Sequence, residues 1–130
     1  MYRCKPDAAV FGVLFPRAFR HNAPMTVPSK IRALSHRIAQ EFHPERIILF
    51  GSHANGRARD DSDVDLLVVM PFKGKGARMS VEILNRVEPE FPVDVIVRTP
   101  RQLRERLALN DFFLSDVVKN GKVLYEAAHA

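Results

Sequence analysis

The sequence predicts an α/β domain in which a small mixed β-sheet is packed with helices. Three short apolar runs, over residues 47–50, 64–69 and 92–98, have the length and the bounding turn residues of buried strands. Two longer segments, over 26–42 and 77–88, place their apolar residues at helical spacing. The alternation of these two kinds of segment favours a sheet covered by helices.

Length and composition narrow the class of protein further. A chain of 130 residues suits one domain with a core of its own. No apolar run approaches the roughly 18 residues of a membrane helix, so no membrane association is expected. The single cysteine, Cys4, excludes an internal disulfide and favours the cytoplasm.

The positive charge is concentrated at the N-terminus. The formal net charge is +5, and residues 1–24 contribute +3 of it through four basic residues and one acidic residue. Basic residues elsewhere are scattered, whereas a nucleic-acid surface normally clusters them. Direct nucleic-acid binding is therefore not expected.

Residues 1–24 also differ from the rest in pattern, because they mix the apolar run Ala8–Phe15 with three prolines. A secretory signal is one interpretation, but the run is short, contains Gly12 and lacks a clear cleavage site. Met25 begins a stretch typical of a domain start. We expect residues 1–24 to be an N-terminal extension, or the product of a misassigned start codon, and residues 25–130 to form the functional domain.

The first half of that domain begins with the helix over 26–42. Pro28 suits its first turn, and His43-Pro44 ends it because the residue before a proline avoids the helical region. Its apolar stripe consists of Ile31, Leu34, Ile38 and Phe42. After the strand over 47–50, Ser52 to Arg57 is expected to form a short helix that Gly56 breaks.

The second half is predicted in the same way. The helix over 77–88 is stopped by Pro89, and its inward residues are Met79, Ile83, Leu84 and Val87. The strand over 92–98 follows. Thr99-Pro100 then opens a helix with Gln102 placed as in a capping box, and its expected core residues are Leu103 and Leu107.

The C-terminal region is predicted to hold one more helix and one more strand. Asn110 or Asp111 caps the helix, and Gly121 suits its end. We interpret the pair Phe112-Phe113 as core, with a partner surface as the alternative. Residues 123–125 are predicted to form a last, edge strand.

One combination of motifs carries the chemistry. Gly51-Ser52 follows a strand, and such a turn can offer backbone N–H groups and a hydroxyl to an anion. Ten residues later, Asp63 and Asp65 open the next strand two positions apart, so both carboxylates leave the same face. Two such carboxylates suit Mg²⁺, which takes one or two carboxylates together with substrate phosphates.

Asp94 adds a third carboxylate, in the middle of an otherwise apolar strand. A carboxylate buried there is costly unless it is paired or binds a metal. Together with Asp63 and Asp65 it predicts a two-metal site. The alternative is structural: a polar entry to one strand, and Asp94 paired with an arginine such as Arg98 or Arg57.

The pattern Gly-Ser, ten residues, Asp-x-Asp and a later strand aspartate resembles the nucleotidyltransferases of the DNA polymerase β superfamily. The sequence is most similar to their small members, the minimal nucleotidyltransferases (MNT type), over Val27 to Glu126. The similarity includes residues 46–52, Gly56-Arg57-Ala58 and the terminal Gly121-x-Val123-Leu124-Tyr125-Glu126. It implies the polymerase β-like fold and a nucleotidyltransferase domain at 25–130.

The resemblance implies AMP transfer from ATP to a hydroxyl with two Mg²⁺ ions. Gly51 and Ser52 would hold the β- and γ-phosphates. Asp63, Asp65 and Asp94 would be the metal ligands and catalytic residues, with Asp94 the acceptor of the proton. Arg57, and Arg59 beside it, would touch the triphosphate or be solvated. His53 is interpreted as a loop residue.

The resemblance also suggests three kinds of acceptor. Relatives of this size are often antitoxins that silence a helical HEPN ribonuclease toxin by adding AMP to a tyrosine, which implies a protein adenylyltransferase and a hetero-oligomer. A small-molecule transferase like the aminoglycoside enzymes is the second hypothesis, although those usually carry an extra helical domain. The third is an antitoxin that acts by binding alone, for which the three aspartates would be unnecessary.

Overall fold

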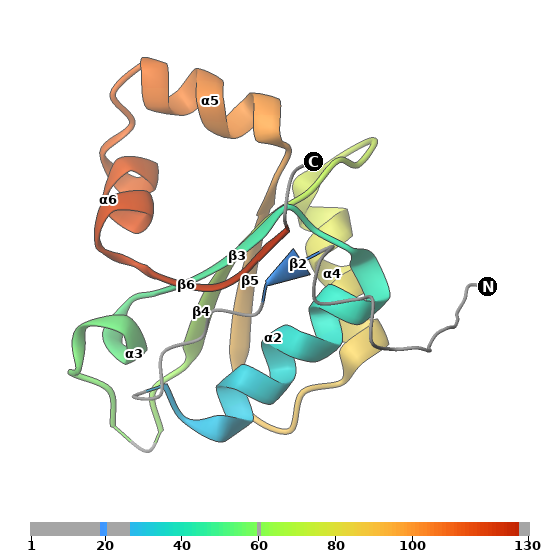
Figure 1. Ribbon diagram of the computed structural model, residues 1–130, viewed down its shortest axis with the longest axis vertical. Coiled ribbons are helices and arrows are strands. Elements are labelled where there is room, and N and C mark those ends of the chain that lie inside the picture. The colour runs from blue at the N-terminus through green and yellow to red at the C-terminus, as the bar shows by residue number, and fades with distance from the viewer. Residues whose placement is uncertain (1–18, 21–26, 60, 128–130) are drawn as a thin grey trace.

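Residues 19–20, 27–59 and 61–127 are described by the computed structural model (Figure 1). Five strands form one sheet in the order β2-β6-β3-β4-β5. Their bounds are Phe19–Arg20 (β2), Arg46–Phe50 (β3), Val64–Val69 (β4), Val93–Arg98 (β5) and Lys122–Ala127 (β6). β4 and β5 run parallel and the other neighbours antiparallel, so the predicted mixed sheet is confirmed.

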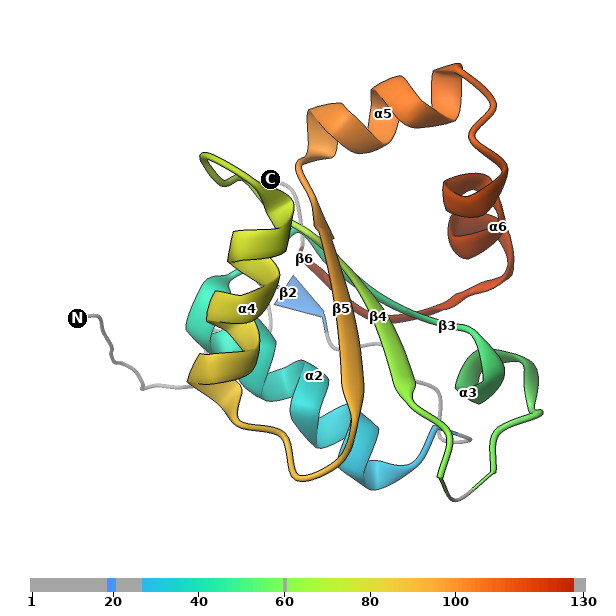
Figure 2. The same ribbon diagram turned by 180° about the vertical axis from the view of Figure 1, so that it is seen from behind.

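Helices cover both faces of this sheet. Their bounds are Ser29–Phe42 (α2), Ser52–Asn55 (α3), Gly76–Val87 (α4), Pro100–Ala108 (α5) and Phe112–Asn120 (α6). α2 and α4 lie together on one face, α5 and α6 lie on the other, and α3 sits at the end of β3 (Figures 1 and 2). None of the helices in the described ranges has the length and apolar character needed to span a membrane.

The face under α2 and α4 holds the larger core. The predicted stripe of α2 is confirmed, since Ile31, Leu34 and Ile38 are buried and Phe42 is half-buried. On α4, Ile83 and Val87 are buried, while Met79 and Leu84 pack against the same cluster. The strands contribute their alternate residues, including Ile47, Leu49, Leu66 and Val68.

The ends of α2 and α4 differ slightly from the predictions. Pro28 is the residue before the first turn of α2 rather than part of it, and the predicted start at Thr26 lies outside the described residues. His43 ends α2 in the left-handed conformation at φ 50°. α4 begins at Gly76 and ends before Glu88, one residue earlier at each end than expected.

The face under α5 and α6 has a smaller core. It consists of Ile48, Leu67, Val69, Leu103, Leu114 and Val117. The predicted capping box is present, with Thr99 Oγ1 accepting from the Gln102 N–H at 3.0 Å and the Gln102 side chain accepting from the Thr99 N–H at 3.0 Å. Asp111 caps α6 by accepting from the Leu114 N–H at 3.0 Å.

The interpretation of Phe112-Phe113 as core is wrong for Phe112, which is 91% exposed, and Phe113 is 49% exposed. A helix of nine residues buries one side only, and Leu114 and Val117 already occupy that side of α6. Phe112 therefore points away from the sheet, toward solvent.

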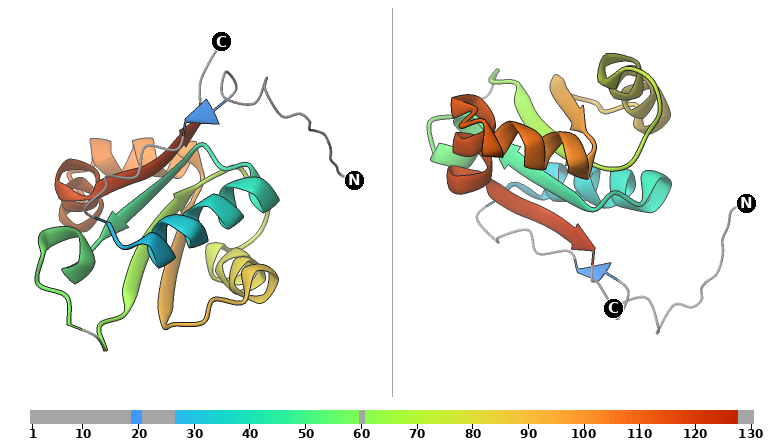
Figure 3. Two further views of the ribbon diagram at one scale, coloured as in Figure 1. Left: turned by 60° about the horizontal axis from the view of Figure 1, so that its bottom comes forward. Right: turned by 90° about the horizontal axis from the view of Figure 1, so that it is seen from above.

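The prediction of a C-terminal edge strand is also wrong. β6 lies between β2 and β3, because Phe19 and Arg20 pair with Ala127 and Glu126 on its outer side (Figure 3). The pairing of β6 with β3 shifts register between Ile47 and Ile48. The domain boundary after residue 24 stays a prediction.

Gly121 ends α6 as expected, but for a different reason. Its φ of −72° is ordinary. A methyl group there would collide with the Val117 carbonyl, the Ile48 side chain and the Leu49 carbonyl. Gly121 thus lets the chain pass close to β3 as it leaves α6. This close approach allows α6 to pack over β3.

Candidate active site

A row of three side chains crosses one end of the sheet, on the face covered by α5 and α6. Phe50 of β3 pairs with Asp65 of β4, and Asp65 pairs with Asp94 of β5. Asp65 shares its face with Leu67 and Val69, which pack under α5 and α6. The structure thus brings Asp65 and Asp94 side by side, and we call Phe50, Asp65 and Asp94 the carboxylate row.

Asp63 lies just outside β4, one residue before Val64, and is exposed. Its charge still reaches Asp65. Burial raises the pKa of the Asp65 carboxyl above its ordinary value, and the charges of Asp94 and Asp63 raise it further. Nearby His53 acts in the opposite direction. The three predicted carboxylates therefore repel one another where a cation would relieve them.

Gly51 lies directly against Asp65. Its backbone has φ 76° and ψ −154°, a combination that is almost confined to glycine. A methyl group at this position would collide with Oδ2 of Asp65. The predicted Gly51-Ser52 turn is thereby placed beside a predicted metal ligand, with α3 beginning at Ser52.

The connection from α3 to β4 is held by hydrogen bonds. His53 Nε2 is 3.1 Å from the Ser62 carbonyl oxygen, so the ring must carry its proton there. The Arg59 N–H donates to Ser62 Oγ at 2.8 Å, and the Ser62 N–H donates to the Arg59 carbonyl at 3.0 Å. These hydrogen bonds hold Ser62, the residue before Asp63, in place.

His53 lies within α3 and not in a loop, which corrects the sequence interpretation. Its contact was missed because the bond spans nine residues of irregular chain, where no periodicity indicates a partner. The helix ends at Asn55 rather than at Arg57, with Gly56 at φ 79° closing it as predicted.

The exposed Arg57 side chain projects from this connection, and the Arg57 N–H donates to the Ser52 carbonyl at 3.0 Å. Within the described ranges, no ion pair joins Asp94 to Arg57 or Arg98. Arg98 instead donates to the Val97 carbonyl at 2.9 Å. The structural alternative for Asp94 thus finds no support in these contacts.

The comparison with protein-family models decides the family. The model described as a nucleotidyltransferase domain matches residues 31–124. The chain belongs to this family. A search of the curated proteins found no match.

Solved structures agree on the fold of this nucleotidyltransferase domain. A candidate nucleotidyltransferase from Sulfolobus solfataricus superimposes with a TM-score of 0.51 at 24% identity, over 73% of this chain and 76% of that chain. A toxin–antitoxin solved with AMP-PNP gives a TM-score of 0.49 at 20% identity, over 73% of each chain. The similarity to the Sulfolobus solfataricus structure supports the predicted fold.

Asp94 was predicted to be buried, whereas its side chain is exposed on β5. The like charges instead act on Asp65, which is half-buried and whose pKa is raised by burial and by the charges of Asp94 and Asp63.

The donor set suits Mg²⁺ only in part. In the part of the chain that the structure describes, no three His, Cys, Asp or Glu side chains are grouped to hold a metal ion. Mg²⁺ commonly completes its shell with waters and substrate phosphates. The three aspartates therefore fit a metal that arrives with the nucleotide, while the number of ions stays a prediction.

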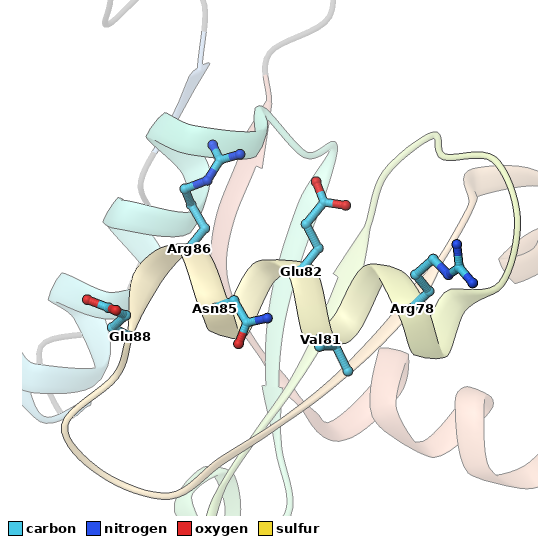
Figure 4. Close-up of a pocket in the computed structure, with 6 residues that line it drawn as sticks. All are labelled: Arg78, Val81, Glu82, Asn85, Arg86 and Glu88. Atoms are coloured by element: carbon cyan, nitrogen blue, oxygen red, sulfur yellow. The ribbon is translucent and has the colours of Figure 1, made fainter.

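Figure 4 shows a pocket elsewhere, along the outer side of α4, with a volume of about 500 Å³. Arg78, Glu82 and Arg86 project from one side of the helix there. No member of the carboxylate row lines it; the lining residues are Arg78, Val81, Glu82, Asn85, Arg86 and Glu88. It is therefore no part of the active site.

Proposed function

We propose that this nucleotidyltransferase moves AMP from ATP to a hydroxyl group of a partner protein, with Mg²⁺ as cofactor. The observation that carries the proposal is the register of β4 and β5, which sets Asp65 beside Asp94 next to Gly51. Glycine-serine turns hold phosphates, and adjacent carboxylates hold the cation that accompanies them. Both parts lie at one end of one sheet face.

In this proposal the chain positions the triphosphate more than it reacts with it. The backbone at Gly51 and Ser52 lies against the β- and γ-phosphates, and the missing Cβ of Gly51 lets the carboxylate of Asp65 approach the same turn. Arg57 reaches the same phosphates from the connection after α3. Catalysis then consists mainly of alignment and charge neutralisation.

The reaction forms a bond between the acceptor oxygen and the α-phosphorus, and the bond from that phosphorus to the β-phosphate oxygen breaks. Pyrophosphate leaves with the electron pair. The hydroxyl proton passes to the carboxylate of Asp94, which is exposed and therefore accessible to an acceptor. Asp63, Asp65 and Asp94 are the residues that would hold Mg²⁺ together with the nucleotide, and the ion would neutralise phosphate charge and lower the pKa of the acceptor hydroxyl.

We propose that the acceptor is a tyrosine of a HEPN-type ribonuclease toxin. This rests on the resemblance to minimal nucleotidyltransferases. It is supported by the exposed side chain of Asp94, which a large acceptor can reach. A protein acceptor can bind through a large surface of its own and does not need to be enclosed in a pocket.

The test is a labelling experiment. The purified protein is incubated with ATP labelled on the α-phosphate, with Mg²⁺, and with the helical protein encoded by the neighbouring reading frame, if that protein contains an Arg-x4–6-His motif. Label on a tyrosine of the neighbour supports the proposal. Label on an aminoglycoside instead indicates a small-molecule transferase, and a tight complex without label indicates an antitoxin that acts by binding alone.

A further inference from the structure

A second pocket lies on the same sheet face as the carboxylate row, between β5, α5 and α6. Its volume is about 550 Å³, within the usual range for ligand pockets. Its lining residues are Gly76, Arg98, Gln102, Arg106, Asp111, Phe113 and Leu114. We call it the elbow pocket, and we call residues 109–113, where the chain turns from α5 into α6, the elbow.

The elbow pocket contains an uncompensated positive charge. Arg98 is half-buried, and its guanidinium has no carboxylate partner among the residues that the structure describes. Arg106, by contrast, forms an ion pair with Asp111 at 2.9 Å. A partly desolvated guanidinium favours a carboxylate from outside, because charge-assisted hydrogen bonds are the strong ones.

Two large apolar residues, Phe113 and Leu114, line the pocket beside its charged residues. Phe113 packs edge-on against Phe50 of the carboxylate row, with ring centroids 5.5 Å apart and planes at 84°. Beside it, Leu109 is 73% exposed and Phe112 is 91% exposed. Exposed aromatic residues close to a half-buried charge are characteristic of protein-binding surfaces.

The distance between the elbow pocket and the carboxylate row suits an acceptor that touches both. Asp94 and Arg98 leave the same face of β5 four residues apart, which corresponds to about 13 Å along a strand. Ile96, half-buried, lies between them. A chain segment that touches Arg98 with one side chain therefore reaches Asp94 with another a few residues away.

We propose that the elbow and its pocket bind the acceptor protein, with Arg98 holding a carboxylate near the acceptor hydroxyl. The inference rests on the proposed function, because it assigns the acceptor side of the same site. An acidic protein segment fits better than a nucleic acid. Of the three arginines on α5, Arg101 and Arg106 are already paired with Glu105 and Asp111, so no basic stripe follows a phosphate chain.

The test uses two fluorescein-labelled peptides that carry one tyrosine, flanked by glutamates in one and by lysines in the other. Binding to the full chain is measured by fluorescence anisotropy, and ATP binding is measured separately by calorimetry. We expect the glutamate peptide to bind the wild type and the lysine peptide to bind at least about tenfold more weakly.

Two variants probe the elbow pocket. Arg98→Gln removes the positive charge of the pocket. Gln102→Glu adds a negative charge there and retains the capping box, because glutamate can accept the same hydrogen bond from the Thr99 N–H as glutamine does. Each is expected to weaken glutamate-peptide binding about tenfold, the loss of roughly one charge-assisted hydrogen bond. Arg104→Gln is the matched control, with the same change in net charge at an exposed residue outside the pocket, and is expected to change binding by less than about twofold.

The proposal is overturned if neither peptide binds, if the lysine peptide binds as well, or if Arg104→Gln matches the two pocket variants. It is also overturned if Arg98→Gln weakens ATP binding by a similar factor, because the pocket then belongs to the donor. A wild type that binds the glutamate peptide but never transfers AMP to its tyrosine contradicts the proposed function and leaves the pocket assignment intact.

Discussion

The two faces of the sheet differ most clearly along β4 and β5. On the side of α2 and α4, Val64, Leu66 and Val68 of β4 are all buried, as are Val95 and Val97 of β5. On the side of α5 and α6 the same strands present half-buried Asp65 and exposed Asp94 at one end. One face is packed for stability along its length, and the other leaves its carboxylate end accessible to ligands.

Replacing a carboxylate of the candidate site should have the largest effect on AMP transfer, without loss of the fold. Asp63→Asn and Asp65→Asn are expected to lower AMP transfer at least about a thousandfold while the fold is retained. Asp94→Asn should reduce the rate more than it reduces ATP binding. Transfer assays, circular dichroism and ATP calorimetry measure these three effects.

Asp61→Asn is the matched control, an exposed carboxylate in the same connection, and should leave transfer within about twofold. Near-normal turnover of Asp63→Asn or Asp65→Asn would show that the metal site is assigned to the wrong residues. Equal losses of rate and ATP binding in Asp94→Asn would indicate a structural role.

A cavity under α2 should affect stability alone. Ile38 is fully buried in the larger core, so Ile38→Ala is expected to lower the free energy of unfolding by about 2–5 kcal/mol. Chemical denaturation measures the loss. ATP affinity, measured where the variant is still folded, should be unchanged; a drop in affinity there would mean that the two faces are coupled.

A substitution at Gly51 should affect both the free energy of unfolding and ATP binding. Gly51→Ala is expected to cost about 1–3 kcal/mol because of its backbone conformation, and also to weaken ATP binding because the new methyl group displaces Asp65. Gly56→Ala is the control, since it has a positive φ of 79° but open space around it. Equal ATP affinities in the two variants would argue against a phosphate contact at Gly51.

Asp65→Asn should also raise the free energy of unfolding at neutral pH. The pKa of Asp65 is raised in the folded state, first by burial and then by Asp94 and Asp63, so its ionised form destabilises the fold. That cost is complete above the folded pKa and vanishes once the pH falls below the unfolded pKa. Thermal unfolding of wild type and variant should therefore converge on acidification; a constant difference would mean that charge is not the cause.

The smallest effect on the free energy of unfolding is expected for a substitution in the elbow. Phe112 is almost fully exposed, so Phe112→Ser should change the free energy of unfolding by less than about 0.5 kcal/mol. Denaturation in parallel with Ile38→Ala gives the contrast. A loss of more than about 1 kcal/mol would mean that this side chain packs within the domain.

Local patterns in the sequence were sufficient for most elements. The stripe on α2 and the capping box at Thr99 follow from interactions within one turn or one helix face, so they could be read directly. The spacing from Ser52 to Asp63 predicted that the Gly51-Ser52 turn and the aspartates belong to neighbouring strands, and β3 does pair with β4. The alternation of side chains then placed Asp65 on a definite face of its strand.

Features set by distant pairing could not be predicted. β6 lies inside the sheet rather than at its edge because it pairs with Phe19 and Arg20, far away in the chain. The exposure of Asp94 depends on how far α5 and α6 extend over β5, which no residue near Asp94 encodes. Phe112 is apolar like its neighbours, and only the docking of α6 decides which side faces outward.

The parallel pairing of β4 and β5 has a consequence for the order in which the protein matures. Asp65 and Asp94 belong to strands that become neighbours only after the crossover through α4 has docked, whereas β3 and β4 pair locally. Long-range contacts form late in folding because a longer loop must close first. The carboxylate row is therefore complete only once the crossover through α4 has docked on the sheet.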